Sequence, residues 1–187
     1  MEFANYSTQN DLIMKQLLTF YKDSSRLERM LGIINGDSQI SLRIVDWFAT
    51  NYSKKYYTVY DLKGKDGISR RFKVYNDYKL KLKAYQKKRF DPFCRWERIV
   101  IPYKNDTSIQ TTIGQLNFFK WAIENQILDY IENNFEAIEK DMNSRNSTAK
   151  RKMTTTENKT RKKREELSIA AAKSIKKETV EIIVKFD

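Results

Sequence analysis

The sequence predicts a single α+β domain in which a small, mostly antiparallel sheet packs against several helices. Hydrophobic residues make up 40% of the 187 residues, which is enough to build a buried core. Apolar residues recur at helical spacing in the first 50 residues and again from 113 to 142. Strand-forming residues cluster between these regions and at the end of the chain. We expect a globular core over 1–142, a flexible basic linker over 143–166, and a helical turn and strand over 167–187 that pair back onto the core.

Two helices are expected at the start of the chain. The segment from Leu12 to Tyr21 has apolar residues three and four positions apart, behind Asn10 or Asp11 as a cap. A second helix, from Leu27 to Ile34, is expected to end before Gly36. Glycine readily adopts the left-handed conformation that terminates helices, so Gly36 marks the end of this element.

A third helix and a β-hairpin are expected next. Ser41 precedes the apolar run 42–48 as a helix cap, although the same run also suits a strand. Aromatic and β-branched residues over 56–60 and 72–75 flank the glycine-containing segment 64–67. This pattern is typical of two antiparallel strands joined by a turn.

The region from Tyr78 to Pro102 has weaker patterns. The spacing of apolar residues over 78–85 suits a helical turn, whereas Leu80 and Leu82 alternate with lysines as in a strand, and both interpretations stay open. The run Arg98–Ile101 is rich in β-branched residues and indicates a short strand that ends at Pro102.

The clearest element is a long amphipathic helix near 113–142. Thr112 and Gln115 have the spacing of a capping box, and apolar residues then form one continuous stripe. The opposite face carries several carboxylates, which would repel a polyanion, so nucleic acid is expected to bind elsewhere.

The C-terminal part is expected to contain two small elements after the polar linker. Leu167–Ala172 suits a helical turn, and Val180–Phe186 suits a strand. A strand needs a partner, and the central hairpin is the simplest one.

Positive charge is concentrated in two segments. The net charge is +12, and counting the charged residues gives +10 over 51–100 and +5 over 151–187, whereas the other two parts are slightly acidic. In the first segment the cations alternate with aromatic residues, a combination that single-strand-binding proteins use for phosphates and bases. The alternative is that the rings pack in the hairpin and the lysines are simply solvated.

The candidate nucleic-acid-binding residues are the cations and rings of these segments. They are Arg70, Arg71, Lys79, Lys81, Lys83, Tyr85, Lys87, Lys88, Arg89, Phe90, Trp96, Lys150, Arg151, Lys152, Arg161, Lys162, Lys163 and Arg164. The last seven form two clusters with the spacing of a bipartite nuclear localisation signal, a disordered nucleic-acid-binding arm or a solubilising linker.

Several classes of site are excluded by composition. The chain has no histidine, and its one cysteine is Cys94, which rules out His-based triads and zinc sites of the Cys and His type. The sequence also shows no phosphate-binding glycine loop and no paired carboxylates for Mg²⁺, so no catalytic residue, metal or cofactor is expected and a non-enzymatic protein is favoured. A metal-dependent activity assembled from distant carboxylates stays a third alternative. The lone thiol and the lack of an apolar leader favour a reducing compartment.

Four stretches resemble an uncharacterised family of small basic proteins of nucleocytoplasmic large DNA viruses, the giant viruses. They are SLRIVDWFATNYSKK at 41–55, KKRFDPFCRWERI at 87–99, TTIGQLNFFKWAIENQILDYI at 111–131, and RKKREELS with VEIIVKFD at 161–168 and 180–187. The resemblance implies a virion or a viral factory in the host cytoplasm, and the two basic clusters add the host nucleus. It assigns no role to any residue.

Two non-enzymatic functions are compatible with these observations. The first is a nucleic-acid-associated protein, binding DNA or RNA, in which cations contact the phosphate backbone and rings stack on bases. The alternative is a minor capsid or other virion structural protein that docks acidic viral proteins through the same charge. No membrane span is expected, because no stretch approaches about 20 consecutive apolar residues.

Overall fold

The structure, a computed structural model, describes residues 8–63, 67, 69–96, 98–103, 107–153 and 176–179. Its helices are α1 (Gln9–Tyr21), α2 (Ser24–Asn35), α3 (Leu42–Trp47), α4 (Ser53–Lys55), α5 (Val74–Tyr85), α6 (Ile113–Glu124), α7 (Ile127–Asn133) and α8 (Phe135–Met153), with a π-helical segment η1 (Phe48–Tyr52) and a 3₁₀ turn η2 (Lys87–Arg89). Its strands are β1 (Val59–Lys63), β2 (Ser69–Lys73), β3 (Arg98–Pro102), β4 (Thr107–Thr112) and β5 (Lys176–Thr179).

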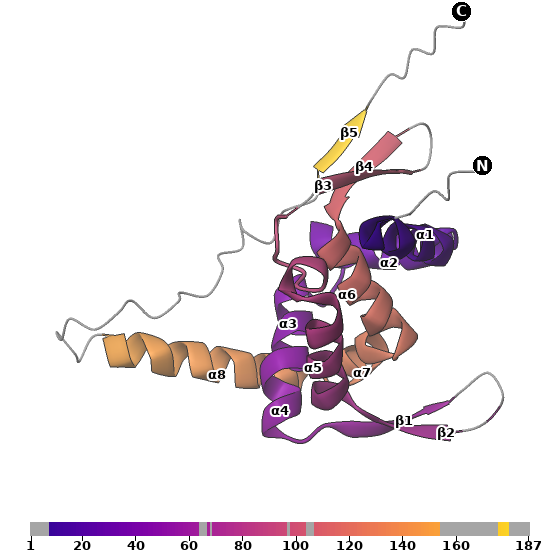
Figure 1. Ribbon diagram of the computed structural model, residues 1–187. Coiled ribbons are helices and arrows are strands. Elements are labelled where there is room, and N and C mark those ends of the chain that lie inside the picture. Colours follow the sequence, from indigo (N-terminus) through magenta and orange to yellow (C-terminus); the bar gives the residue numbers. More distant parts are fainter. Residues whose placement is uncertain are drawn as a thin grey trace, which may run out of the picture.

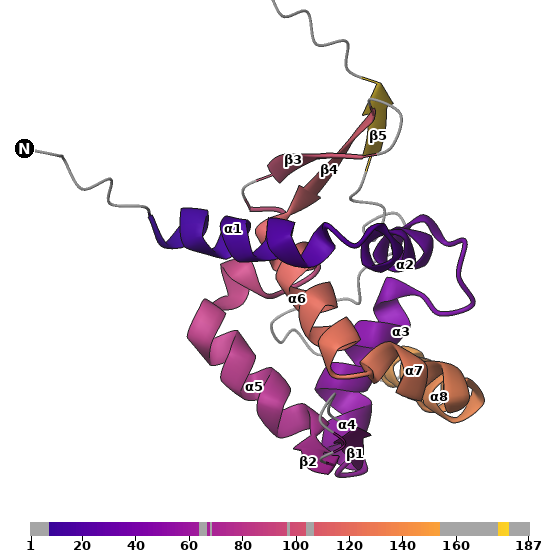
Figure 2. The ribbon, with the colours of Figure 1, turned by 90° about the vertical axis from the view of Figure 1, so that its right-hand side faces the viewer.

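The helices form the body of the molecule, and two small antiparallel sheets lie at its opposite ends (Figures 1 and 2). One sheet is the hairpin β1–β2, and the other has the strand order β3–β4–β5. The predicted single α+β domain is therefore confirmed, although the strands form two separate sheets.

The first two predicted helices are present, but a different residue caps the start of α1. The hydroxyl of Thr8 accepts the N–H of Asp11 at 3.3 Å, and the Asp11 carboxylate accepts the N–H of Thr8 at 2.8 Å. This capping box places the cap at Thr8, so the expected cap at Asn10 or Asp11 is wrong. The second helix ends at Gly36 with φ of 85°, as predicted.

The third helix and the hairpin are also present, with shifted limits. Ser41 caps α3 through its hydroxyl, and the chain stays helical through η1 and α4, which excludes the strand alternative. In the hairpin, Val59 of β1 lies opposite Lys73 of β2. Tyr56 and Tyr57 therefore precede the sheet, although the sequence predicted them as strand residues.

The open question over 78–85 is decided in favour of a helix. Val74 and Tyr75, expected at the end of the hairpin, already belong to the first turn of α5. Val74 and Tyr78 face the core, while Lys79 and Leu80 face solvent. The alternating leucines and lysines are therefore distributed around one helix.

The predicted long helix is divided into three. Its start is confirmed, because the Thr112 hydroxyl accepts the N–H of Gln115 at 3.2 Å. The helix stops at Asn125 and Gln126, and Gln126 has φ of 54°, a left-handed conformation that a right-handed helix cannot include. A second break at Asn134 separates α7 from α8. One continuous helix over 113–142 is therefore wrong, although most of the segment is helical.

The C-terminal arrangement differs from the prediction. Helix α8 continues to Met153, so 143–153 are helical and not part of a linker. Strand β5 lies just before the predicted Val180–Phe186 and pairs with β4, not with the central hairpin. Residues 154–175, which include the predicted turn Leu167–Ala172, and 180–187 lie outside the described residues.

Helix α6 is the centre of the core. Every residue from Ile113 to Phe119 is buried, and α1, α7, β4 and η2 all contact this helix. The hydroxyl of Tyr21 on α1 donates to the backbone carbonyl of Leu116 at 2.8 Å, which ties the two helices together within the apolar core. The position of α6 consequently fixes the position of η2 and its basic residues.

The approach of η2 to α6 depends on Gly114. A Cβ atom at this position would lie 2.7 Å from the carbonyl oxygen of Asp91 and 3.2 Å from that of Lys88. Because both contacts are to backbone atoms, Gly114→Ala should displace η2 and lower the free energy of unfolding by about 1–3 kcal/mol, measured by urea denaturation.

Gly32→Ala is the matched control for that substitution. Gly32 lies inside α2, and a Cβ there would meet no atom within 4 Å. The added methyl should stabilise the protein by up to about 1 kcal/mol through helix propensity alone. Equal effects of the two substitutions would contradict the close packing at Gly114.

Candidate nucleic-acid interface

Positive charge is concentrated on the continuous segment β2–α5–η2 and the loop that follows it. Residues 69–96 contain ten lysines and arginines and only two carboxylates. We call the exposed cations of β2, α5 and η2 the basic surface; they are Arg70, Arg71, Lys73, Lys79, Lys83, Lys87 and Lys88. Six of these seven cations were predicted from the sequence, and Lys73 is the addition. All seven belong to consecutive elements of the chain, of which β2 and α5 are labelled in Figure 1.

The two carboxylates of this segment are already engaged in hydrogen bonds. Asp77 accepts the indole N–H of Trp121 at 2.6 Å. Asp91 accepts the N–H of Phe93 at 2.8 Å and forms an ion pair with Lys87 at 3.4 Å. Most of the positive charge of the basic surface therefore has no acidic neighbour within its own segment.

A half-buried carboxyl, that of Asp46, interacts with Lys87 of η2 and with Asp91 in the loop that follows. Burial and the negative charge of Asp91 raise the pKa of Asp46 in α3 to about 7, and the positive charge of Lys87 opposes this increase. Lys87 therefore has two acidic neighbours, and its charge is less available to a ligand than those of Lys79, Lys83 and Lys88.

The predicted stacking rings differ in exposure. Phe90 is only 1% exposed, so its predicted role in stacking is wrong; it is a core residue. Tyr85 is half-buried and stacks on Phe90, with ring centroids 6.0 Å apart. Trp96 is half-buried, and the ammonium group of Lys88 lies 4.8 Å from its ring centroid. Tyr85 and Trp96 remain the rings that a base can reach in part.

Arg89 has a positioning role. Its guanidinium donates to the side-chain oxygen of Asn10 at 2.7 Å and to that of Gln9 at 3.1 Å. Its backbone carbonyl accepts the side-chain N–H of Asn117 at 2.9 Å. Arg89 therefore joins η2 to both α1 and α6, which reduces its availability for phosphate.

The basic clusters near the C-terminus are described only in part. Lys150, Arg151 and Lys152 lie in the last turn of α8, which extends away from the body in Figure 1. The predicted contacts Arg161, Lys162, Lys163 and Arg164 lie outside the described residues.

An exposed ring that the sequence did not single out is Tyr57. It is 86% exposed and has φ of 49°, an uncommon conformation for a residue with a Cβ atom. Its neighbour Tyr56 is held by Asp141, which accepts the Tyr56 hydroxyl and the Lys55 ammonium. The adjoining tyrosines and lysines were the available signal, but the strand prediction assigned them to the hairpin.

The carboxylates of the 113–142 segment do not all face away from the basic surface. Asp129 and Glu132 pair with Arg29 of α2 at 2.5 and 3.2 Å. Glu124 instead lines a pocket shared with β2 and α5, where it pairs with Lys120 at 3.7 Å. The expectation that the whole acidic face points elsewhere is therefore wrong for Glu124.

Neither a metal site nor a membrane helix is found in the part of the chain that the structure describes. No group of three or more Cys, Asp or Glu side chains in those residues has the arrangement of a metal site. None of the described helices combines the length and the apolar character that a bilayer crossing requires.

Sequence comparisons place the chain among viral proteins of unknown function. An uncharacterized protein of Acanthamoeba polyphaga mimivirus is 48% identical over 128 residues, which are 66% of this chain and 49% of the relative. The chain thus spans about half the length of the curated relative that it matches. No solved structure matches it. The predicted relationship to an uncharacterised giant-virus family is confirmed, and residues 3–186 match one family throughout: the chain belongs to the family of unknown function DUF7197.

Proposed function

We propose that this viral protein is a non-enzymatic nucleic-acid-binding protein that contacts the phosphate backbone through the basic surface. The observation that carries the proposal is the ratio of ten cations to two engaged carboxylates over 69–96. Such a local excess attracts a polyanion and releases its counterions. We propose that the protein acts in a virion or in a viral factory.

The chemistry of the surface favours binding without sequence preference. Lys79 and Lys83 lie one helical turn apart on the exposed face of α5, and Lys88 follows on η2. Lysine ammonium groups act as flexible point charges, which suit phosphates better than base edges. Trp96 beside Lys88 adds a ring surface on which a base can stack.

The test is a gel shift of DNA at increasing salt with a triple variant, Lys79→Gln, Lys83→Gln and Lys88→Gln. Each phosphate contact contributes roughly −0.9 to the slope of log K against log salt on duplex DNA, so three lost contacts should make the slope shallower by about 2–3. Glutamine keeps the helix propensity of α5.

The matched control replaces three exposed lysines elsewhere, Lys15, Lys22 and Lys140, by glutamine. This variant has the same net charge but keeps the basic surface. We expect the slope of log K against log salt for this variant to stay close to that of the unmodified protein. Equal losses in both variants would mean that net charge and not the basic surface drives binding, and a flat salt titration of the unmodified protein would overturn the proposal.

A second candidate function is the docking of acidic viral proteins by a minor capsid or virion component. It is favoured by Leu80, which is 66% exposed on α5 next to Lys79. An apolar side chain among cations suits a protein partner better than a phosphate backbone. Cofractionation with shells of disrupted virions, together with no DNA retardation, would support this alternative.

A further inference from the structure

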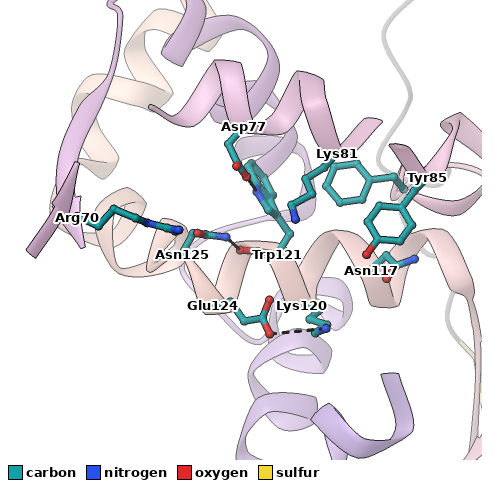
Figure 3. A pocket seen from close by; sticks show the side chains of 10 residues that line it. Arg70, Asp77, Lys81, Tyr85, Asn117, Lys120, Trp121, Glu124 and Asn125 are labelled. Carbon is teal, nitrogen blue, oxygen red and sulfur yellow. Dashed lines mark hydrogen bonds and ion pairs between the residues drawn. The ribbon is translucent and has the colours of Figure 1, made fainter. Parts of the chain in front are cut away.

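A pocket of about 300 Å³ lies between β2, α5 and α6. Arg70 reaches into it from β2 and Lys81 from α5, and their charged groups point into the same space (Figure 3). The buried rings of Phe90 and Trp121 form part of its wall, and Tyr85 and Asn117 line one side. The volume is at the lower end of the range for small-ligand sites.

Two cations of this pocket have no acidic partner among the residues that the structure describes. Both carboxylates that line it are engaged, Asp77 by the indole of Trp121 and Glu124 by Lys120. Neither Arg70 nor Lys81 forms an ion pair or hydrogen bond with another described residue. With Lys120, the lining holds three cations and two carboxylates, a net charge of +1. The two cations that have no ion pair favour an anion with several strong acceptor oxygens.

We propose that this pocket binds the phosphate group of a nucleotide, with Arg70 and Lys81 as its ligands. A guanidinium and an ammonium group reaching in from two elements match a phosphate better than a single carboxylate does, because phosphate offers three acceptor oxygens. The inference deepens the proposed nucleic-acid function and rests on it.

The remaining lining residues suit the rest of a nucleotide. The ring of Tyr85 is half-buried at the pocket, where it offers a flat apolar face to a base. The Nδ2 of Asn117 is committed to the carbonyl of Arg89, which leaves the amide oxygen to accept from a base amino group. A recess of this size admits one nucleotide and excludes a stacked duplex, so the bound strand is unpaired.

The test compares two double variants of the full chain that differ only in where the lost charges lie. Arg70→Gln with Lys81→Gln removes the two pocket cations. Arg71→Gln with Lys79→Gln removes one cation from the same strand and one from the same helix, outside the pocket. Thermal melts of both variants verify folding, and affinities for a single-stranded oligonucleotide and for its duplex are measured by fluorescence anisotropy.

We expect the pocket variant to bind the single strand at least about tenfold more weakly than the control variant, given the cost of losing charged hydrogen bonds. Duplex affinity should fall at least as much in the control variant, because Arg71 and Lys79 both belong to the basic surface and Lys81 does not. Equal loss of single-strand affinity in the two variants would overturn the pocket while leaving the proposed function intact. Failure of the unmodified protein to bind either nucleic acid would overturn the proposed function itself.

A second measurement identifies the source of the phosphate. Inorganic phosphate, adenosine monophosphate and the single-stranded oligonucleotide are titrated separately into labelled protein, and the side-chain NMR signals of Arg70 and Asn117 are followed. Shifts with the mononucleotide at concentrations where the oligonucleotide has no effect would support the phosphate site and assign it to a free nucleotide. No shift with any of the three ligands would overturn the site.

Discussion

Phe90→Ala is expected to lower the free energy of unfolding by about 3–5 kcal/mol, the usual cost of deleting a fully buried aromatic ring. Phe90 is 1% exposed and contacts the rings of Tyr78, Tyr85, Phe118 and Trp121, with centroids 5.7 to 6.0 Å away. The cavity would lie where α5, η2 and α6 meet, so these elements lose their common packing partner. Urea denaturation followed by tryptophan fluorescence measures the loss.

Trp96→Ala is the matched control, because Trp96 follows in the same loop and is half-buried. Its deletion should cost less stability than that of Phe90, and its effect should be seen mainly in nucleic-acid affinity. If Phe90→Ala instead left the free energy of unfolding unchanged and weakened DNA binding, the result would indicate that the Phe90 ring is exposed in the unmodified protein. The packing described for η2 would then be wrong.

The sequence could predict those parts of the fold that depend on residues close together in the chain. A helix cap is formed by residues a few positions apart, so the side chain that makes it can be recognised without knowing the tertiary structure. Ser41, Gly36 and Thr112 each end or begin a helix as their residue types indicate. The apolar stripe over 113–142 likewise predicted the helical core.

The features that were missed depend on contacts between distant segments. Strand β4 is polar apart from Ile109, and it becomes a strand because β3 and β5 supply its hydrogen bonds. The break at Gln126 carries no glycine or proline signal. There the hydroxyl of Tyr60 in β1 donates to the carbonyl of Asn125 at 2.7 Å, a contact that no local pattern reveals.

The same distinction applies to the candidate site. The cations of the basic surface were visible in the sequence, because charged side chains are solvated whatever the fold. The separate roles of Phe90 and Arg89 were not, since burial of the ring and the bonds from Arg89 to α1 arise from packing. The pocket at Arg70 and Lys81 also joins the consecutive elements β2 and α5 to α6, which comes later in the chain.

Asp46→Asn is expected to stabilise the protein relative to the unmodified chain at pH 8 and much less at pH 4. Burial and Asp91 raise the pKa of Asp46 from 3.8 to about 7, so the folded state retains a proton that the unfolded state releases. Unfolding then releases a proton between these two pH values, and stability falls as pH rises through this window. The difference corresponds to about 4 kcal/mol at most.

The asparagine variant does not titrate at this position, so its stability relative to the unmodified protein should rise steadily from pH 4 to pH 8. Comparing the two proteins by urea denaturation at each pH cancels the contributions of groups that do not interact with Asp46. Tyr78, Lys87 and Asp91 do interact with it, so their response to the substitution is part of the measured difference. Asp37→Asn, on the exposed turn after α2, controls for the loss of one negative charge. A stability difference that is the same at both pH values would show that Asp46 is ionised in the fold. The ionised Asp46 would then need a compensating charge, and Lys87 is the cation whose charge lowers the pKa of Asp46.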